Sequence, residues 1–317
     1  MNLYTKFYGL KEEPFLLTPD PRFLHLAQPH REALTTLLES VLMRRGIMLF
    51  TGPVGTGKTT LLHAALQILS QKPGMQKRLR SAFIVIPTLS GDEFLEAVLD
   101  EFEVPSAGKS KPARLQALHK MLLETHRADG LAVLLIDEAH LLTPALLEEV
   151  RLLSNVDTYG GKLLQIVLCG QPELIPALRR KEMAALQQRI ASRSALRALT
   201  QAEAGDYIVE RLHIAGLENQ TSFTARAIEI VYFLSHGVPR VINLLCDGSL
   251  RLGARTERRH IQPEMVEEVA VALDLNAEEP PTDGLIIPGS GVEPEVLQSA
   301  VDVLIHAMKQ ARRSGRE

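Results

Sequence analysis

The chain has 317 residues, enough for about two domains and a sizeable hydrophobic core. Hydrophobic residues make up 45% and charged residues 23%, as in an ordinary globular chain, and a net charge of −3 gives no global attraction to nucleic acid or to an anionic membrane. The N-terminus mixes Lys, Glu and aromatic residues, unlike a signal peptide, and no run of 18 apolar residues predicts a transmembrane helix. We therefore expect a cytoplasmic protein without direct membrane insertion, in which Cys169 and Cys246 are buried free thiols.

Strands and helices alternate through the first two thirds of the chain. Residues 1–30 are rich in aromatics and prolines, which predicts an ordered but irregular lead-in, and a helix follows over residues 30–44. Unbroken apolar strands separated by helices predict an α/β fold with a parallel sheet covered on both faces. The strands are expected at residues 47–51, 82–87, 131–136 and 163–169, and the later helices at residues 58–70, 92–102, 113–127 and 144–155.

The last third is predicted to be helical. Glycine and proline punctuate residues 200–274 into three or four helices, and residues 275–292 are crowded with both residue types, which indicates a linker. Residues 293–317 form an amphipathic helix that either docks back on the chain or lies in the groove of a partner. We expect a lead-in with the first helix (1–44), an α/β domain (45–199), a helical lid domain (200–274), the linker and the final helix.

The most specific motif follows the strand at residues 47–51 and matches the P-loop pattern G-x-x-x-x-G-K-[ST] in full. Glycines let backbone N–H groups turn inward around phosphates, since no Cβ stands in the way. Lys58 would place its charge on the β and γ phosphates of ATP, the Thr59 hydroxyl would ligate Mg²⁺, and the helix would direct its positive end at the same oxygens. The predicted nucleotide-binding residues here are Gly52, Pro53, Val54, Gly55, Thr56, Gly57, Lys58, Thr59 and Thr60.

Two acids end the apolar strand at residues 131–136. In the neighbourhood of a P-loop, Asp137 is expected to hold the Mg²⁺ shell and Glu138 to act as the base for the attacking water. With Ala139 and His140 the run also spells the Asp-Glu-Ala-His box of a helicase superfamily. Such a helicase needs a second nucleotide-binding-like domain, and no further parallel-sheet pattern follows residue 199, so we set this alternative aside.

Polar residues further on could complete the site. Gln171 leaves the strand at residues 163–169 and is the candidate sensor of the γ phosphate. Arg189, Arg193 and Arg197 recur every four residues and would share one helix face if this segment is helical. Arg193, or else Arg189, could serve a neighbouring subunit as an arginine finger. Arg240 follows Pro239 in the first turn of a lid helix and could reach a phosphate between the two domains. A surface arginine or a plain turn residue is the alternative at each of these positions.

Together these segments resemble one family, the ATPases of the ExeA type found in general secretion, pilus and exopolysaccharide loci. The resemblance spans about residues 1–272. Its segments are Phe7-Tyr8-Gly9-Leu10, Pro14-Phe15, Thr18-Pro19-Asp20-Pro21-Arg22-Phe23, His30-Arg31-Glu32-Ala33-Leu34, the P-loop, Leu135-Ile136-Asp137-Glu138-Ala139, Gly170-Gln171-Pro172-Glu173-Leu174, Gln188-Arg189-Ile190 and Gly237-Val238-Pro239-Arg240-Val241-Ile242-Asn243.

The resemblance implies an AAA+ fold, ATP hydrolysis between subunits and a homo-oligomeric ring or stack. It gives Gln171 the place of the first sensor, Arg193 or Arg189 that of the finger, and Arg240 that of the second sensor. Two departures stand out. His140 replaces a Gln of many relatives, which should leave hydrolysis undisturbed. Secretion-type members also carry a membrane span and a peptidoglycan-binding region after the ATPase, where this sequence has the linker and one helix.

Three functions stay open. The chain could drive assembly of a secretion, pilus or polysaccharide system through a protein client. It could be an ATP-dependent, DNA-bound regulator that forms a filament and recruits a transposase, since such regulators carry the same ATPase module. It could also be a scaffold that binds ATP and hardly turns it over. A cluster formed by Arg251, Arg255, Arg258, Arg259 and His260 would suit DNA, although it equally suits the dipole of a helix end. His30 and the other scattered histidines are interpreted as surface or packing residues.

Overall fold

The computed structural model describes residues 3–18, 23, 26–85, 89–105, 110–158, 161–217 and 222–275, and the account below concerns these residues. The predicted linker beyond Leu275 and the predicted helix over residues 293–317 lie outside them. Within these ranges no helix combines the length and the apolar character needed to cross a membrane.

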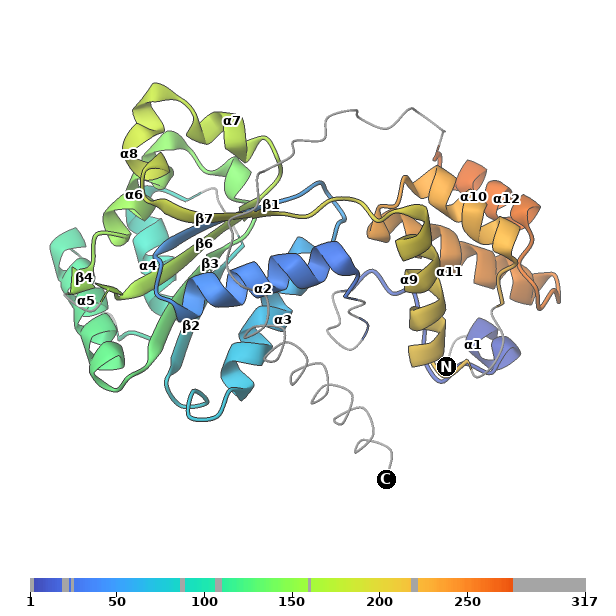
Figure 1. Ribbon diagram of the computed structural model, residues 1–317, viewed down its shortest axis with the longest axis horizontal. Coiled ribbons are helices and arrows are strands. Elements are labelled where there is room, and N and C mark those ends of the chain that lie inside the picture. The colour runs from blue at the N-terminus through green and yellow to red at the C-terminus, as the bar shows by residue number, and fades with distance from the viewer. Residues whose placement is uncertain are drawn as a thin grey trace. The chain divides into compact units, whose positions relative to one another are not determined.

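Five parallel strands form a sheet in the order β2-β3-β6-β1-β7, as Figure 1 shows. The predicted parallel α/β fold class is therefore confirmed. Because all strands run the same way, the segments that follow β1, β3 and β6 leave the sheet at the same edge, where the P-loop and the two acids lie. The strands are β1 (Ile47–Thr51), β2 (Leu79–Ile84), β3 (Leu131–Ile136), β6 (Leu164–Gly170) and β7 (Ile190–Ala195).

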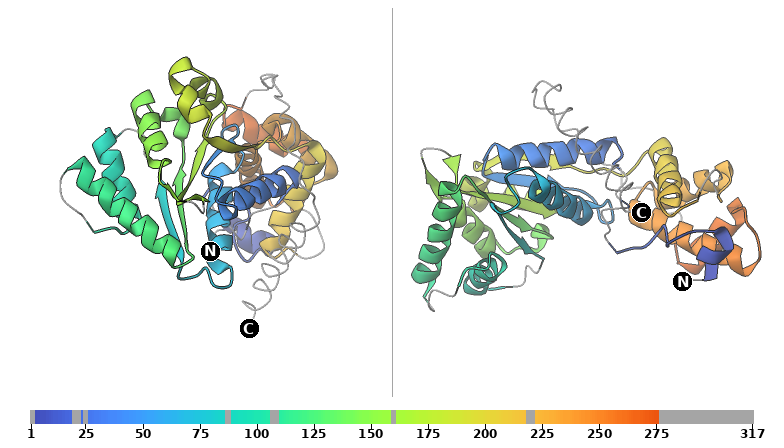
Figure 2. Two further views of the ribbon diagram at one scale, coloured as in Figure 1. Left: turned by 60° about the vertical axis from the view of Figure 1, so that its left-hand side comes forward. Right: turned by 90° about the horizontal axis from the view of Figure 1, so that it is seen from below.

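Helices cover both faces of the sheet. Helices α2 and α3 lie on one face, and α4, α5 and α6 lie on the other, where their apolar side chains form one buried cluster with the strands (Figures 1 and 2). The unbroken burial of β1, β3 and β6 follows from this double cover. The bounds are α2 (Gln28–Leu42), α3 (Lys58–Gln71), α4 (Gly91–Glu101), α5 (Lys111–Arg127), α6 (Pro144–Leu153), α7 (Leu174–Leu178) and α8 (Ala184–Gln187), with a small hairpin of β4 (Asp157–Thr158) and β5 (Gly161–Lys162).

Strand β7 corrects a prediction. We expected no strand after residue 169, and one helix face for Arg189, Arg193 and Arg197 if their segment was helical. Instead β7 is the outer strand beside β1, with Arg193 opposite Leu49, and its residues alternate between half-buried and exposed. A spacing of four residues is about one helical turn but also two full strand alternations, so the arginine pattern could not separate the two structures.

The lid has its own hydrophobic cluster. Its helices α10 and α12 start side by side at a bridge between Phe223 and Ile261, and both pack on α11. Thr200 begins α9 with a capping box in which Glu203 is the reciprocal partner. The bounds are α9 (Gln201–Ile214), α10 (Ala225–Ser235), α11 (Pro239–Arg255) and α12 (Pro263–Ala272).

The lead-in packs with the lid, and it begins with a short helix, α1 (Leu3–Tyr8), where an irregular segment was expected. Tyr4 donates a hydrogen bond to Asp247 Oδ1 (2.8 Å), and Tyr8 donates one to the carbonyl of Arg258 (2.9 Å). Burial raises the pKa of Tyr8 to about 12. A six-residue helix is too short to be stable alone, so these contacts with α11 hold it. The predicted domain boundaries stay predictions.

Candidate nucleotide site

The P-loop joins the end of β1 to the start of α3. Gly55 and Gly57 have φ angles of 77° and 93°, in the left-handed region that favours glycine, and Gly57 is the N-cap of α3. The first backbone N–H groups of α3 therefore point into the loop with the positive end of the helix behind them. This geometry suits an anion.

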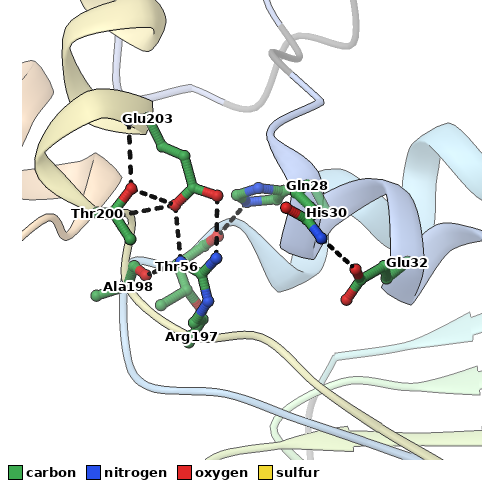
Figure 3. Close-up of polar contacts among 8 residues, drawn as sticks. All are labelled: Gln28, His30, Glu32, Thr56, Arg197, Ala198, Thr200 and Glu203. Atoms are coloured by element: carbon green, nitrogen blue, oxygen red, sulfur yellow. Dashed lines mark hydrogen bonds and ion pairs between the residues drawn. The ribbon is translucent and has the colours of Figure 1, made fainter. Parts of the chain in front are cut away.

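Lys58 lies inside the curve of the loop. Its Nζ donates to the carbonyls of Gly52 (2.8 Å) and Pro53 (3.0 Å), and the residue is only 6% exposed. The Thr56 hydroxyl donates to the Pro53 carbonyl (2.8 Å). From α2, His30 Nε2 lies 3.0 Å from the Thr56 carbonyl, as Figure 3 shows. We expected His30 to be a surface or packing residue; it is buried and contacts the P-loop.

The lid touches the P-loop directly. The backbone N–H of Arg240 donates to the Gly55 carbonyl (3.2 Å). A Cβ at Gly55 would lie 2.8 Å from Arg240 Cβ and 3.0 Å from Val238 Cγ1, so a side chain there would displace the lid. Arg240 is exposed in the first turn of α11, next to Pro239, and lines the same cavity as the P-loop.

Oxygen ligands suited to Mg²⁺ lie beside the loop. Thr59 donates from its hydroxyl to Asp137 Oδ2 (2.6 Å), and Asp137 is 2% exposed. The backbone N–H of Glu138 donates to the other Asp137 oxygen (2.9 Å). One hydroxyl and one carboxylate fit a Mg²⁺ ion that takes its remaining ligands from phosphate and water. In the part of the chain that the structure describes, no group of three or more His, Cys, Asp or Glu could hold a metal.

Glu138 has an unusual backbone. Its φ of 52° and ψ of 34° place it in the left-handed region, which costs a residue with a side chain about 1–3 kcal/mol. Its side chain is 38% exposed and lines the cavity. Near Asp137, the Cys169 thiol is buried. This burial and the Asp137 carboxylate raise the pKa of the thiol, which stays neutral.

Gln171 contacts the turn that follows Glu138. Its side-chain Nε2 is 3.0 Å from His140 Nε2, and the other imidazole nitrogen of His140 is 3.4 Å from Glu138 Oε2. The predicted sensor and the predicted base are thus brought together through a histidine. We expected His140 to leave hydrolysis undisturbed and assigned its side chain no contact in the site.

A cavity of about 370 Å³ opens beside the P-loop and continues to the lid. Val54, Gly55, Thr56, Gly57, Lys58, Thr59 and Thr60 lie on its phosphate side. Sequence reasoning missed the opposite wall, which we call the lid side. The lid side consists of Leu16, Leu17, Thr18 and Phe23 of the lead-in and Tyr207, Arg211 and Asn243 of the lid.

A hydrogen-bond network holds the lid side together. Arg211 is 7% exposed; its Nε donates to the Pro14 carbonyl (2.6 Å), and one terminal nitrogen donates to the Tyr207 hydroxyl (2.9 Å). Tyr207 donates in turn to Asn243 Oδ1 (2.9 Å). The guanidinium also lies 5.0 Å from the Phe23 ring centroid. Tyr207 and Arg211 stand one helical turn apart, which was the available sequence signal.

The three arginines around β7 do not line this cavity. Arg189 donates to Ser154 (3.3 Å) and to Asn155, and Arg193 is exposed on β7. Arg197 pairs with both Glu203 oxygens, at 2.7 and 3.0 Å (Figure 3). This guanidinium, with the Thr200 donors, lowers the pKa of Glu203 to about 2.

Comparison with known proteins agrees with this geometry. A family model for an AAA domain matches residues 41–178. General secretion pathway protein A of Aeromonas hydrophila is 40% identical over 252 residues, a match that covers 78% of this chain and 44% of that protein. The chain therefore spans less than half the length of this relative.

Two solved structures show the same fold. The ORC2 protein of Aeropyrum pernix, in ADPNP-ADP complexes, is 15% identical with a TM-score of 0.62, over 82% of this chain and 71% of that one. Drosophila ORC bound to DNA is 15% identical with a TM-score of 0.63, over 87% of this chain and 67% of that one. The domain match and the sequence relative confirm the predicted family: the chain carries an AAA domain of the ExeA type.

Proposed function

We propose that this chain binds Mg·ATP and hydrolyses it at contacts between copies of itself. The observation that carries the proposal is the contact of Thr59 with Asp137 at 2.6 Å beside a complete P-loop, with Glu138 next to it on the cavity wall. Each oxygen donor has a role in phosphoryl transfer to water, and the arrangement fits that reaction as a whole.

Each residue of the site has its own role. Lys58 exchanges the Gly52 and Pro53 carbonyls for phosphate oxygens. Thr59 and Asp137 hold Mg²⁺, which neutralises the charge of the phosphates when bound. The Glu138 carboxylate accepts the proton of the attacking water. Arg240 extends from the lid toward the phosphates, and the base of the nucleotide packs on the lid side, whose leucines and Phe23 suit a flat ring.

Arg193, or else Arg189, acts on the nucleotide of a neighbouring copy. Neither lines the cavity of its own chain, and both belong to the region of the outer strand β7, which a second copy can approach. Arg193 is exposed, whereas Arg189 is already held by Ser154. An arginine finger supplied in this way is worth roughly 10³–10⁵ in rate in systems of known mechanism.

The work done with ATP is assembly of a secretion, pilus or exopolysaccharide system, on the cytoplasmic side, where ATP is available. Support comes from the relative named General secretion pathway protein A, with 40% identity. A regulator of transposition that binds DNA is the second candidate. Exposed Arg255, Arg258 and Arg259 favour it. Arg251 contributes less, because it already pairs with Asp247 (2.6 Å) and Glu13 (3.5 Å).

The direct test measures Mg·ATP binding and phosphate release for the parent chain and for Glu138→Gln. We expect the variant to bind ATP with parental affinity and to release phosphate at least about 100-fold more slowly, since it lacks the base. Glu182→Gln, an exposed glutamate outside the cavity, is the matched control. Hydrolysis by Glu138→Gln at the parental rate would refute the assigned base, and absence of Mg·ATP binding by the parent would refute the function.

The same assay, extended to mixtures and to DNA, tests the remaining parts. Chains with Lys58→Ala still carry Arg193, and chains with Arg193→Ala still carry the P-loop, so a mixture should regain turnover that neither has alone. No recovery with either Arg193→Ala or Arg189→Ala argues against a finger in trans. Salt-dependent binding to duplex DNA, with growth of the particles in ATP, would select the transposition candidate.

A further inference from the structure

His140 occupies a turn that two parts of the site share. It belongs to the short 3₁₀ helix Ala139–Leu141, directly after Glu138, and its side chain is 12% exposed. On one side, Nδ1 is 3.4 Å from Glu138 Oε2, and on the other Nε2 is 3.0 Å from the side-chain nitrogen of Gln171. Among the described residues, His140 is the side chain placed against the Glu138 carboxylate.

The partners fix the polarity of the imidazole. A carboxylate accepts hydrogen bonds, and the Gln171 amide nitrogen donates them. A neutral imidazole satisfies both when it carries its proton on Nδ1, facing Glu138, and accepts from Gln171 at Nε2. The Gln171 backbone N–H, 3.4 Å from Nδ1, donates to that nitrogen in the other tautomer. With the proton on Nδ1, polar contacts run from Gln171 through His140 to Glu138, whose Oε2 lies 3.4 Å from Nδ1.

The backbone holds Glu138, His140 and Gln171 close to one another. A Cβ at Gly170 would lie 3.0 Å from the backbone nitrogen of His140, so the end of β6 and the turn pack against each other without a side chain between them. A displacement of Gln171 therefore reaches His140 directly. The left-handed backbone of Glu138 adds to this, because the direction of its side chain depends on the turn that follows.

We propose that His140 is a positioning residue for hydrolysis: it ties the Glu138 carboxylate to Gln171, so that the end of β6 orients the general base. This inference rests on the proposed ATP hydrolysis. It predicts an effect on turnover and little effect on binding, since His140 contacts neither the P-loop nor the lid side of the cavity. Packing alone would instead change stability and leave the turnover of the folded enzyme unchanged.

The test compares His140→Ala and His140→Gln in the full chain. For each, kcat and KM for Mg·ATP, the affinity for a non-hydrolysable ATP analogue, and the melting temperature are measured. We expect His140→Ala to lower kcat roughly tenfold, with the affinity within about twofold of the parent, because a displaced base loses rate and leaves binding intact. Glutamine has both an acceptor and a donor, so His140→Gln should retain kcat within about threefold.

Three further variants sharpen the result. Gln171→Ala should lower kcat, and adding His140→Ala to it should cost little more, because the two side chains act as one unit. The control is His119→Ala. His119 is exposed on α5 and lies outside the cavity, so this variant should match the parent.

The outcomes separate the two proposals. Phosphate release by His140→Ala at the parental kcat, or equal losses in His140→Ala and His140→Gln, would overturn the positioning role while ATP hydrolysis stood. Absence of phosphate release from the parent chain would end the proposed function, and this inference would fall with it.

Discussion

The two sides of the cavity are built in different ways. The phosphate side comes from consecutive residues: the P-loop from Gly52 to Thr59 closes on itself, and Asp137 meets it from the end of a neighbouring strand. The lid side joins the lead-in to helix α9, in contacts such as that of Arg211 with Pro14, which stand 197 residues apart in the chain. The first depends on local backbone geometry, and the second on tertiary packing.

This difference has a chemical consequence. Amides and one ammonium group on the phosphate side recognise charge, and they would bind any polyphosphate of suitable length. The lid side offers Leu16, Leu17 and Phe23 beside the Tyr207–Asn243 pair, which suits an apolar ring with a polar rim. We therefore expect substitutions on the two sides to remove phosphate recognition and nucleobase recognition separately.

Replacing Lys58 with Ala should have the largest effect. The variant loses charge-assisted hydrogen bonds to phosphate, worth about 3 kcal/mol or more in total, so the Kd for Mg·ATP should rise at least about 100-fold. Binding of magnesium tripolyphosphate should fall in parallel, because no base is involved. Isothermal titration with both ligands checks this, with the exposed Lys72→Ala as control. Parental affinity of the Lys58 variant for tripolyphosphate would contradict the comparison.

A substitution on the lid side should weaken the binding of Mg·ATP without weakening that of magnesium tripolyphosphate. Leu17 is 49% exposed and lines the cavity, so a base packed on it would bury apolar surface worth about 1 kcal/mol. Leu17→Ser should therefore weaken Mg·ATP about fivefold and leave tripolyphosphate binding unchanged. Leu115→Ser, a half-exposed leucine on α5 outside the cavity, should change neither. Equal weakening of Mg·ATP and tripolyphosphate binding would show that the nucleobase does not pack on Leu17.

Sequence reasoning succeeded where a function needs neighbouring residues. The P-loop and the pair Asp137 and Glu138 follow strands whose apolar runs end in polar residues, and parallel pairing brings those ends to one edge. It failed on β7, because a period of four is shared by helix and strand. It did not identify the contacts of His30 and His140, whose partners Thr56 and Gln171 are 26 and 31 residues away. The lid side could not be predicted, since nothing in a lone Tyr207 or Leu17 specifies the segment it will face.

The smallest effect is expected at the joint between the two sides, where the chain leaves β7 for α9. There Arg197 holds Glu203, whose pKa is lowered from 4.5 to about 2. A carboxyl with a lowered pKa in the folded state adds stability above its unfolded pKa, and this contribution is lost as the pH falls from about 4.5 toward 2. Because Arg197 is half-exposed, we expect Arg197→Ala to lower the free energy of unfolding by only about 1 kcal/mol at pH 7.

Urea denaturation of the parent and Arg197→Ala between pH 7 and pH 3 measures this contribution. The gap between the two chains should stay constant down to about pH 5 and then narrow, since protonated Glu203 gains nothing from the guanidinium. Arg226→Ala, which breaks an exposed pair with Glu229 inside α10, should cost less at pH 7. A gap for Arg197→Ala that persists unchanged to pH 3 would mean that Arg197 acts through packing, and that the joint is held by the Thr200 cap alone.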